Sequence, residues 1–367
     1  MTMPISATAA VLHAPDAPFS LETIQLGELR PNELLVDIHA TGLCHTDLLP
    51  RLPALGERLV PLVLGHEGAG VVIEVGSAVS SIKPGDHVLL SFDSCGVCER
   101  CRADDPAYCR HFRAINLTGQ RLDGSVAALD RHGIPVANRW FGQSSFATLA
   151  IATERNTVAI DPSLPLEVLA PLGCGLQTGA GAVLNEMKPR PGQSIAVLGV
   201  GAVGLAAVMA AGIAEAATIV AVDRHASRLE LAARLGATAQ VFGDTGELRK
   251  AIAGDGPGLD FVLDTTGAPE VIRAGVAALR PHGRAILVGA GASPVSFHPS
   301  ELTGVTIGYI LEGSANPKRF LPELVAHWRA GRFPIERLIA SYPLADIGAA
   351  ETDMLAGHVA KPVLVTR

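Results

Sequence analysis

The sequence predicts an α/β protein in which a doubly wound parallel sheet is inserted into a second, mostly-β domain. A strand, a glycine-rich turn, a helix and another strand follow one another over residues 194–223, and strands keep alternating with helices up to residue 289. Such alternation is typical of a parallel sheet covered by helices. The residues before this part instead form short apolar runs separated by turns.

The composition is that of a folded protein with a sizeable apolar core. Of the 367 residues, 48% are hydrophobic and 18% charged, and 39 glycines and 25 prolines provide many turns. Basic and acidic residues number 29 and 36, which gives a net charge of −7, and no run of lysine or arginine exceeds two. Nucleic-acid binding needs a concentrated basic surface, so we expect no nucleic-acid partner.

Two segments bear on cellular location. Residues 1–12 contain no lysine, arginine or long apolar run, which argues against a secretory signal. The uncharged run 194–214 has the length of a membrane span, but four glycines interrupt it, and a turn between a strand and a helix explains three of them. We therefore expect a cytoplasmic protein without membrane association.

The inserted domain is predicted at residues 176–317. Its strands are expected at 194–198, 218–222, 260–264 and 284–289, and its helices at 205–211, 227–235 and 269–279. The surrounding domain then comprises residues 1–175 and 318–367. Its expected elements are strands at 34–40, 70–75, 87–91 and 362–365, a turn at 84–86, and helices at 317–330 and 347–355.

Four of the six cysteines crowd into one short segment. Cys95, Cys98, Cys101 and Cys109 lie within fifteen positions, and Gly96 eases the turn between the first two. Two-residue spacings allow consecutive thiolates to face one tetrahedral ion at about 2.3 Å. Free or redox-active cysteines are the alternative, but four at this spacing favour a structural zinc in a lobe at 92–112. Four thiolates close the coordination shell, so this site offers no position for chemistry.

The remaining cysteines suggest a second metal site of a different kind. Cys44 follows the strand at 34–40, Cys174 lies in a glycine-rich segment, and His66 and Glu67 lie between two glycines. Taken singly, a buried cysteine is usually a small hydrophobic residue and a histidine usually a core or surface residue. Two thiolates, one imidazole and a nearby carboxylate together form the pattern of a catalytic zinc with an open fourth position.

A nucleotide-binding signature follows these residues. The strand at 194–198 runs into the turn Gly199, Val200, Gly201, Ala202, Val203 and Gly204, and a helix comes next. Asp223 ends the second strand, 19 positions after the last glycine. Such a turn brings backbone amides to a pyrophosphate, and such a carboxylate binds the ribose hydroxyls of NAD. Arg224 could soften the rejection of NADP, and a glycine turn without a ligand is the remaining alternative.

The combined motifs resemble the zinc-containing alcohol dehydrogenases of the medium-chain dehydrogenase/reductase family. The pattern Gly65-His66-Glu67-x2-Gly70-x5-Gly76-x2-Val79 matches the zinc alcohol dehydrogenase signature, and the resemblance extends over nearly the whole chain. Within the family, the segments 141–148, 171–181 and 332–334 are similar to bacterial aryl-alcohol and geraniol dehydrogenases. The resemblance implies a GroES-like catalytic domain around a Rossmann domain.

The resemblance also implies roles for individual residues. Zinc held by Cys44, His66 and Cys174 would lower the pKa of the alcohol hydroxyl, and hydride would pass to NAD. Glu67 would be a carboxylate beside the metal, and Asp47 would orient the histidine. Thr46 would accept the proton, Thr178 would contact the nicotinamide, and His45 would be a cation near the pyrophosphate. A local turn hydrogen bond is the alternative role of each threonine. Leu49 stands where many family members have a proton-relay histidine.

The substrate expected from the resemblance is a primary aromatic or allylic alcohol. Phe92, Trp140 and Phe141 lie where the family builds its substrate channel, although all three could be core residues. A glutathione-linked formaldehyde dehydrogenase, a general aliphatic alcohol dehydrogenase and a non-catalytic zinc- and nucleotide-binding relative are the alternatives. The family further implies two zinc ions per chain and a homodimer or homotetramer, with strands near 300–310 at the subunit interface.

Overall fold

The computed structural model describes residues 5–52, 59, 61–243, 248–254, 256–291 and 293–367. The chain divides into two compact units. Unit 1 contains Met1–Cys174, Asn316–Val325 and Ile335–Arg367, and unit 2 contains Gly175–Ala315 and Ala326–Pro334. Unit 2 is therefore formed largely by one continuous segment, and unit 1 is completed by the C-terminal part of the chain.

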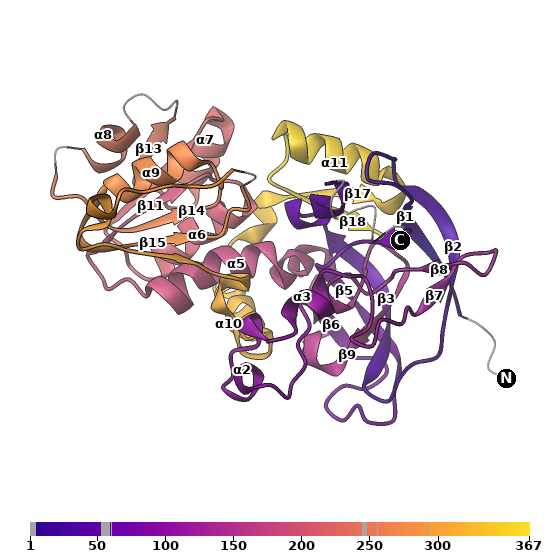
Figure 1. Ribbon diagram of the computed structural model, residues 1–367. Helices are drawn as coiled ribbons and strands as arrows, with labels where there is room; N and C mark the ends of the chain where they lie inside the picture. Colours follow the sequence, from indigo (N-terminus) through magenta and orange to yellow (C-terminus); the bar gives the residue numbers. More distant parts are fainter. Residues whose placement is uncertain (1–4, 53–58, 60, 244–247, 255, 292) are drawn as a thin grey trace. The chain divides into compact units, whose positions relative to one another are not determined.

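Unit 2 is built on a six-stranded parallel sheet (Figure 1). In spatial order its strands are β13 (Ala239–Phe242), β12 (Thr218–Asp223), β11 (Ser194–Leu198), β14 (Leu259–Asp264), β15 (Leu279–Leu287) and β16 (Thr306–Tyr309). Its helices include α5 (Gly175–Gly181), α6 (Ala202–Ile213), α7 (Ala226–Arg234), α8 (Leu248–Ala253) and α9 (Pro269–Ala277).

Helices cover both faces of this sheet because β11 is apolar on both sides. Adjacent residues of a strand point to opposite faces. A Cβ at Gly204 of α6 would lie 3.2 Å from Val197, and one at Gly275 of α9 would lie 2.5 Å from Leu198. Glycine thus allows α6 and α9 to pack closely against opposite faces. The doubly wound parallel sheet predicted from the sequence is confirmed.

Unit 1 contains a five-stranded and a seven-stranded sheet. The five-stranded sheet comprises, in spatial order, β4 (Leu62–Val63), β1 (Ile5–Leu12), β2 (Ser20–Leu26), β7 (Ala128–Leu129) and β8 (Pro135–Val136). The path of the larger sheet is β10 (Thr157–Ile160), β6 (His87–Leu90), β5 (Gly68–Val75), β3 (Glu33–Gly42), β18 (Lys361–Val365) and β17 (Ile339–Pro343), with β9 (Leu149–Thr153) also paired to β3. Further helices are the short α2 (Glu99–Arg102), α3 (Phe112–Asn116) and α4 (Leu166–Leu169) and the longer α10 (Pro317–Arg329) and α11 (Ile347–Ala356). All of these except α4 are labelled in Figure 1.

Strand β3 organises the larger sheet of unit 1. Its alternate residues Leu34, Val36 and Ile38 are buried in one apolar cluster, as its alternation predicts. The end of β3 pairs antiparallel with β18, and Gly42 faces Val363. This pairing brings the last strand of the chain to the loop that follows β3.

Most elements expected from the sequence are present, with ends shifted by a few residues. Nine strands were not predicted individually, namely β1, β2, β4, β7, β8, β9, β10, β13 and β17. Exposed or half-buried residues dominate β2, β13 and β17, so their apolar pattern is weak. The uncharged run 194–214 forms β11 and α6. Within the described residues, no helix combines the length and apolar character needed to cross a membrane.

Candidate active site

Four potential metal ligands from three parts of unit 1 converge at one point. One ligand atom each from Cys44, His66, Glu67 and Cys174 lies within 4.8 Å of all the others. Cys44 follows β3, His66 and Glu67 come directly before β5, and Cys174 comes directly before α5. The structure thus brings together the four residues that the sequence assigned to one metal site.

The imidazole of His66 is held in one orientation. Its Nδ1 lies 2.8 Å from Oδ1 of Asp47, and both side chains are completely buried. The same carboxylate accepts hydrogen bonds from the backbone amides of Gly65 at 3.1 Å and Cys44 at 3.2 Å. Burial alone would lower the pKa of His66, but the charges and hydrogen bonds of Asp47 and Cys44 together outweigh it and raise the pKa well above its ordinary value.

The other ring nitrogen is the atom that fits a metal. Nε2 of His66 is buried and has no hydrogen-bond partner among the described residues. The pKa of the Cys44 thiol is lowered well below its ordinary value, because a hydrogen bond from Cys174 and the positive charge of Lys361 favour the thiolate over the effect of burial. Two cysteines and an imidazole oriented by a carboxylate are a typical donor set of catalytic zinc.

Glu67 also contacts a buried cation. The side-chain nitrogen Nζ of Lys361 lies 2.9 Å from each carboxylate oxygen of Glu67 and 3.3 Å from the carbonyl oxygen of Leu43. Lys361 and Glu67 have side-chain exposures of 2% and 0%. Lys361 was not predicted, since a lysine at the start of an apolar C-terminal strand gives no local signal.

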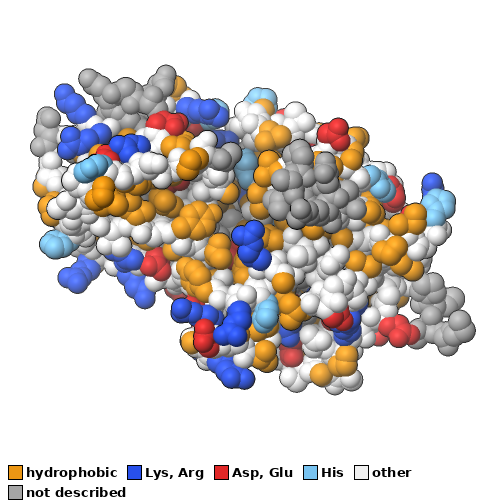
Figure 2. Space-filling model, in the orientation of Figure 1, with side chains coloured by type: hydrophobic (Ala, Val, Ile, Leu, Met, Phe, Trp, Pro, Cys, Tyr) orange, Lys and Arg blue, Asp and Glu red, His pale blue; other side chains and the backbone are white. Residues whose placement is uncertain are grey.

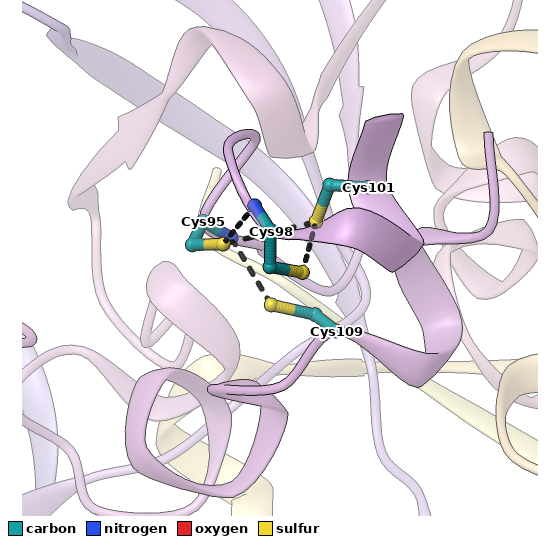
Figure 3. A group of neighbouring side chains, drawn as sticks. All are labelled: Cys95, Cys98, Cys101 and Cys109. Atoms are coloured by element: carbon teal, nitrogen blue, oxygen red, sulfur yellow. Dashed lines mark hydrogen bonds between the residues drawn. The ribbon is translucent and has the colours of Figure 1, made fainter. Parts of the chain in front are cut away.

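The four clustered cysteines form the second potential metal site (Figure 3). Sγ of Cys101 lies 3.9 Å from that of Cys95 and 3.5 Å from that of Cys98, and the four sulfur atoms point toward a common centre. The backbone amide of Cys98 donates to Cys95, and that of Cys95 donates to Cys109. Gly96 at φ +72° makes the turn between them. The donor set fits a tetrahedral structural zinc.

Two of these cysteines, Cys98 and Cys109, differ in the acidity of their thiols. Backbone hydrogen bonds from Cys101 and then Arg110 lower the pKa of Cys98 to about 6. Burial raises the pKa of Cys109 to about 12. Cys98 is therefore deprotonated more readily than Cys109, because the amides of the turn stabilise its thiolate.

The residues around Cys44 lie in a short 3-10 helix, His45–Arg51. Thr46 is half-buried, and its Oγ1 lies 3.8 Å from Sγ of Cys44. His45 is exposed, and Leu49 is half-buried. The hydroxyl of Thr46 is therefore beside one candidate metal ligand.

The three aromatic residues assigned to the substrate channel are all buried. Phe92, Trp140 and Phe141 are exposed by only 2%, 1% and 2%. The ring of Phe141 contacts His66, and the centroids are 4.6 Å apart. It also packs edge-on against Trp140 and Phe112. A role of these three side chains in binding substrate stays a prediction.

Gln143 is a further residue of this region that was not predicted. Its Nε2 donates to the carbonyl oxygens of His66 and Ser91, at 2.9 Å each, and its Oε1 accepts from the amide of Gly68 at 3.0 Å. These hydrogen bonds hold the backbone on both sides of Glu67. The partners lie 52 to 77 positions away from Gln143 in the sequence, so no local pattern indicates these hydrogen bonds.

The glycine turn of unit 2 has the features of a pyrophosphate-binding loop. Gly199 has φ +84°, a conformation that favours glycine. A Cβ at Gly204 would lie 2.0 Å from the carbonyl oxygen of Gly199, whereas one at Gly201 would meet no atom within 4 Å. The first glycine thus makes the turn, the third allows helix packing, and the second leaves the backbone accessible to a ligand. Ala202 and Val203 begin α6 at this loop.

Asp223 lies at the end of β12, next to this loop. One of its oxygens accepts a hydrogen bond from the amide of Val200 at 2.9 Å, and the other lies 2.9 Å from Nδ1 of His225. Arg224 is exposed. Thr178 is half-buried in α5. The loop and the carboxylate fit the pyrophosphate and ribose of a dinucleotide.

Charge on the surface shown in Figure 2 is mixed. Basic side chains are scattered over this face, with acidic and uncharged side chains between them. A mixed face of this kind does not form the continuous basic stripe that nucleic-acid recognition uses.

Comparison with known proteins identifies two matching domain families. Residues 30–162 match the alcohol dehydrogenase GroES-like domain. Residues 202–325 match the zinc-binding dehydrogenase domain. The candidate metal ligands Cys44, His66 and Glu67 lie in the first matched region, and Asp223 lies in the second.

The chain is similar over almost its whole length to several dehydrogenases. It is 43% identical to geraniol dehydrogenase of Castellaniella defragrans, with 98% of each chain covered. It is 45% identical to an alcohol dehydrogenase zinc-binding domain protein from Burkholderia ambifaria, with a TM-score of 0.95 over 98% of this chain and 99% of that one. It is 40% identical to benzyl alcohol dehydrogenase from Acinetobacter calcoaceticus, with a TM-score of 0.92 over 99% and 100%. The chain therefore belongs to the zinc-dependent alcohol dehydrogenases of the medium-chain dehydrogenase/reductase family, which combine a GroES-like catalytic domain with a Rossmann-type nucleotide-binding domain.

Proposed function

We propose that this enzyme oxidises a primary aromatic or allylic alcohol, of the benzyl alcohol or geraniol type, reversibly to the aldehyde, with NAD as hydride acceptor. The observation that carries the chemistry is the buried convergence of Cys44, His66 and Cys174. The similarity to geraniol dehydrogenase and benzyl alcohol dehydrogenase supports the substrate class.

In this proposal each ligand cluster holds one zinc ion. Cys44, His66 and Cys174 bind the catalytic zinc, with Glu67 beside it, and the four clustered cysteines bind the structural zinc. Zinc at the first cluster acts as a Lewis acid that lowers the pKa of the substrate hydroxyl. Asp47 fixes the histidine ligand through the 2.8 Å contact with Nδ1 and leaves Nε2 to face the metal.

Thr46 receives the proton of the alcohol at its Oγ1. Its hydroxyl lies beside Cys44, at 3.8 Å from Sγ, so it can reach a substrate oxygen placed at the same metal. Leu49 cannot relay a proton. We propose that the proton leaves Thr46 through the cofactor ribose and water.

Unit 2 binds the cofactor, which supplies the hydride acceptor. Backbone amides of the loop 199–204 contact the pyrophosphate, and Asp223 accepts hydrogen bonds from the ribose hydroxyls. His45 and Arg224 provide positive charge near the phosphates and the adenosine ribose, and Thr178 packs against the nicotinamide. Under this proposal residues 176–317 form the nucleotide-binding domain and residues 1–175 and 318–367 the catalytic domain.

An apolar channel selects the alcohol. Phe92, Trp140 and Phe141 provide the aromatic side chains that we assign to this channel. The contact of the Phe141 ring with His66 supports the assignment, because it places an aromatic side chain beside a proposed metal ligand. We further propose that the enzyme acts in the cytoplasm as a homodimer or homotetramer.

The decisive test measures NADH formation by the purified protein with NAD and benzyl alcohol, geraniol, ethanol or sorbitol. We expect a strong preference for the first two. Activity confined to ethanol or sorbitol would contradict the substrate class, and zinc-loaded protein inactive with every alcohol would contradict the proposed reaction. A C44S variant, which lacks one thiolate of the catalytic cluster, is the control and should be inactive.

A further inference from the structure

Gln143 is a completely buried amide that has no role in the proposed reaction. Both hydrogens of its side-chain nitrogen are used, because Nε2 donates to the carbonyl oxygens of His66 and Ser91 at 2.9 Å each. Its Oε1 accepts from the amide of Gly68 at 3.0 Å. Ser91 directly follows β6. The side chain of Gln143 therefore joins the backbone around one candidate metal ligand to the end of this strand.

Ser91 extends these contacts to a second candidate metal ligand. Its hydroxyl donates to the carbonyl oxygen of Gly173 at 2.6 Å, in a buried hydrogen bond. Gly173 directly precedes Cys174. A Cβ at Gly173 would lie 2.3 Å from the carbonyl oxygen of Leu90, so only glycine fits beside the end of β6. The hydrogen bonds of Gln143 and Ser91, which we call the amide–hydroxyl network, thus hold two ligand segments that are far apart in the sequence.

The backbone that carries Gln143 has an uncommon conformation. Phe141, Gly142 and Ser144 have φ values of +51°, +69° and +53°. This left-handed conformation is unfavourable for Phe141 and Ser144 and persists only where the surroundings fix it. One such contact is the hydroxyl of Ser144, which donates to the carbonyl oxygen of Val63 at 2.6 Å. The segment around Gln143 is therefore itself held in place, as the support of a metal site needs to be.

We propose that the amide–hydroxyl network positions the backbones of His66 and Cys174 for metal binding and so retains the metal at this cluster. Asp47 orients the ring of His66, but a ring contact alone does not fix the distance between two separate chain segments. Groups that hold metal ligands from behind typically raise metal affinity by about 10- to 100-fold. Gln143 and Ser91 are thus positioning residues. This inference rests on the proposed function only in that the cluster binds a metal.

The test measures the affinity of full-length variants for Co²⁺ in competition with a chelator, by the visible absorption of cobalt bound to thiolates. Q143M keeps the length of the side chain and removes its three hydrogen bonds, and S91A removes the hydroxyl. We expect the affinity of the buried cluster to fall by about 10- to 100-fold in Q143M and by less in S91A. S91T, which keeps the hydroxyl, should resemble the parent. C44S shows the absorption of the four-cysteine site by itself.

Two further readouts separate positioning from a general loss of stability. Asn138 is 3% exposed, and its Oδ1 accepts from the amide of Ala127, next to β7. N138L therefore removes a buried amide elsewhere in unit 1 and should lower the melting temperature without changing the cobalt affinity. In metal-free protein, hydrogen exchange at the amide of Gly68 should be faster in Q143M than in N138L, because that amide has lost its acceptor.

The double variant Q143M/S91A tests whether both residues act through the same network. Its loss of cobalt affinity should be smaller than the two single losses combined, since either substitution already breaks the connection. S91A and S91T still test the inference if Q143M fails to fold, because they differ only in whether the hydrogen bond to Gly173 can form.

Folded Q143M and S91A that bind cobalt as tightly as the parent would overturn the inference. A loss in N138L as large as that in Q143M would also overturn it, because lower stability alone would then release the metal. A parent protein that bound no cobalt at the buried cluster would overturn both this inference and the proposed function. A parent that bound cobalt there but oxidised no alcohol would contradict the proposed function alone, since none of these measurements uses NAD or an alcohol.

Discussion

The phenyl ring of Phe141 lies against the imidazole of His66, with ring centroids 4.6 Å apart and planes inclined by 32°. Asp47 fixes the same imidazole at its edge, at 2.8 Å from Nδ1. The imidazole of His66, a candidate metal ligand, is therefore held at its edge by Asp47 and on its face by Phe141. Phe141 occupies this place with φ +51°, a left-handed conformation that is uncommon for a bulky side chain.

Removing the Phe141 ring should destabilise unit 1 and loosen the metal site. Phe141 is only 2% exposed, and truncating a buried phenylalanine to alanine lowers the free energy of unfolding by about 3–5 kcal/mol. We expect F141A to lower the free energy of unfolding by this amount in urea titrations followed by tryptophan fluorescence. Phe242 is 67% exposed, so F242A is a control that should change stability little. Parental stability of F141A would contradict the packing role.

The two metal clusters should be separable by metal analysis. Because each cluster offers a complete donor set, we expect about two zinc ions per chain, and about one in either C44S or C98S. C98S should also lower the melting temperature markedly, since a closed zinc site ties its loop together. C44S should abolish turnover and lower the melting temperature less. A parental zinc content in C98S would argue against the structural site.

The buried ion pair between Glu33 and Arg121 should make stability fall at acid pH. Nε and Nη2 of Arg121 each lie 2.7 Å from an oxygen of Glu33. Burial alone would raise the pKa of Glu33, but the hydrogen bonds from Arg121 and the charge of Arg139 lower it below its ordinary value. The ionised form is therefore favoured in the folded state. Its contribution is fully present above the unfolded pKa of about 4.3 and is lost as the pH falls through the lower folded pKa.

We expect E33Q to be less stable than the parent at pH 7 by about 3 kcal/mol, the cost of removing one partner of a buried pair. The difference should shrink below pH 4, as the parental carboxylate takes up a proton. Melting temperatures between pH 3 and pH 8 measure both effects. E74Q, at an exposed glutamate of β5, is the matched control. A difference between E33Q and the parent that did not vary with pH would contradict this explanation.

Asp223 should determine the preference for NAD. Its carboxylate is almost fully buried, and its oxygens face the loop amide of Val200 and the ring of His225. A 2′-phosphate placed at the ribose would be repelled by this charge. We expect D223S to raise the ratio of kcat/KM for NADP over NAD by about tenfold or more. An unchanged ratio would show that Asp223 does not discriminate between the two cofactors. E230Q, at an exposed glutamate of α7, controls for nonspecific effects of losing an acidic side chain.

Local patterns predicted much of the fold and the four-cysteine cluster, whereas Cys44, His66 and Cys174, which lie far apart in the sequence, were assigned to one site by residue type and by the family resemblance. The four cysteines of the lobe lie within fifteen positions, so a short turn is enough to bring their sulfur atoms together. The same holds for Gly199, Gly201 and Gly204, because a tight turn and a helix start are set by neighbouring residues. The strand at 194–198 was predicted with its observed ends because five consecutive apolar or small residues precede the turn.

Other features depend on residues distant in the sequence, and no single segment reveals them. Lys361 and Glu67 are 294 positions apart, and only the pairing of β18 with β3 makes them neighbours. Gln143 reaches His66 across 77 positions, and Phe141 meets the same histidine through a left-handed turn. Each contact satisfies a charge, a polar atom or a ring surface that folding removes from water. Residue type and spacing thus determined which groups can bind zinc and nucleotide. The tertiary structure decided which side chains orient, neutralise and pack against these groups. Burial makes such partners necessary, and the groups are buried only once the strands have paired.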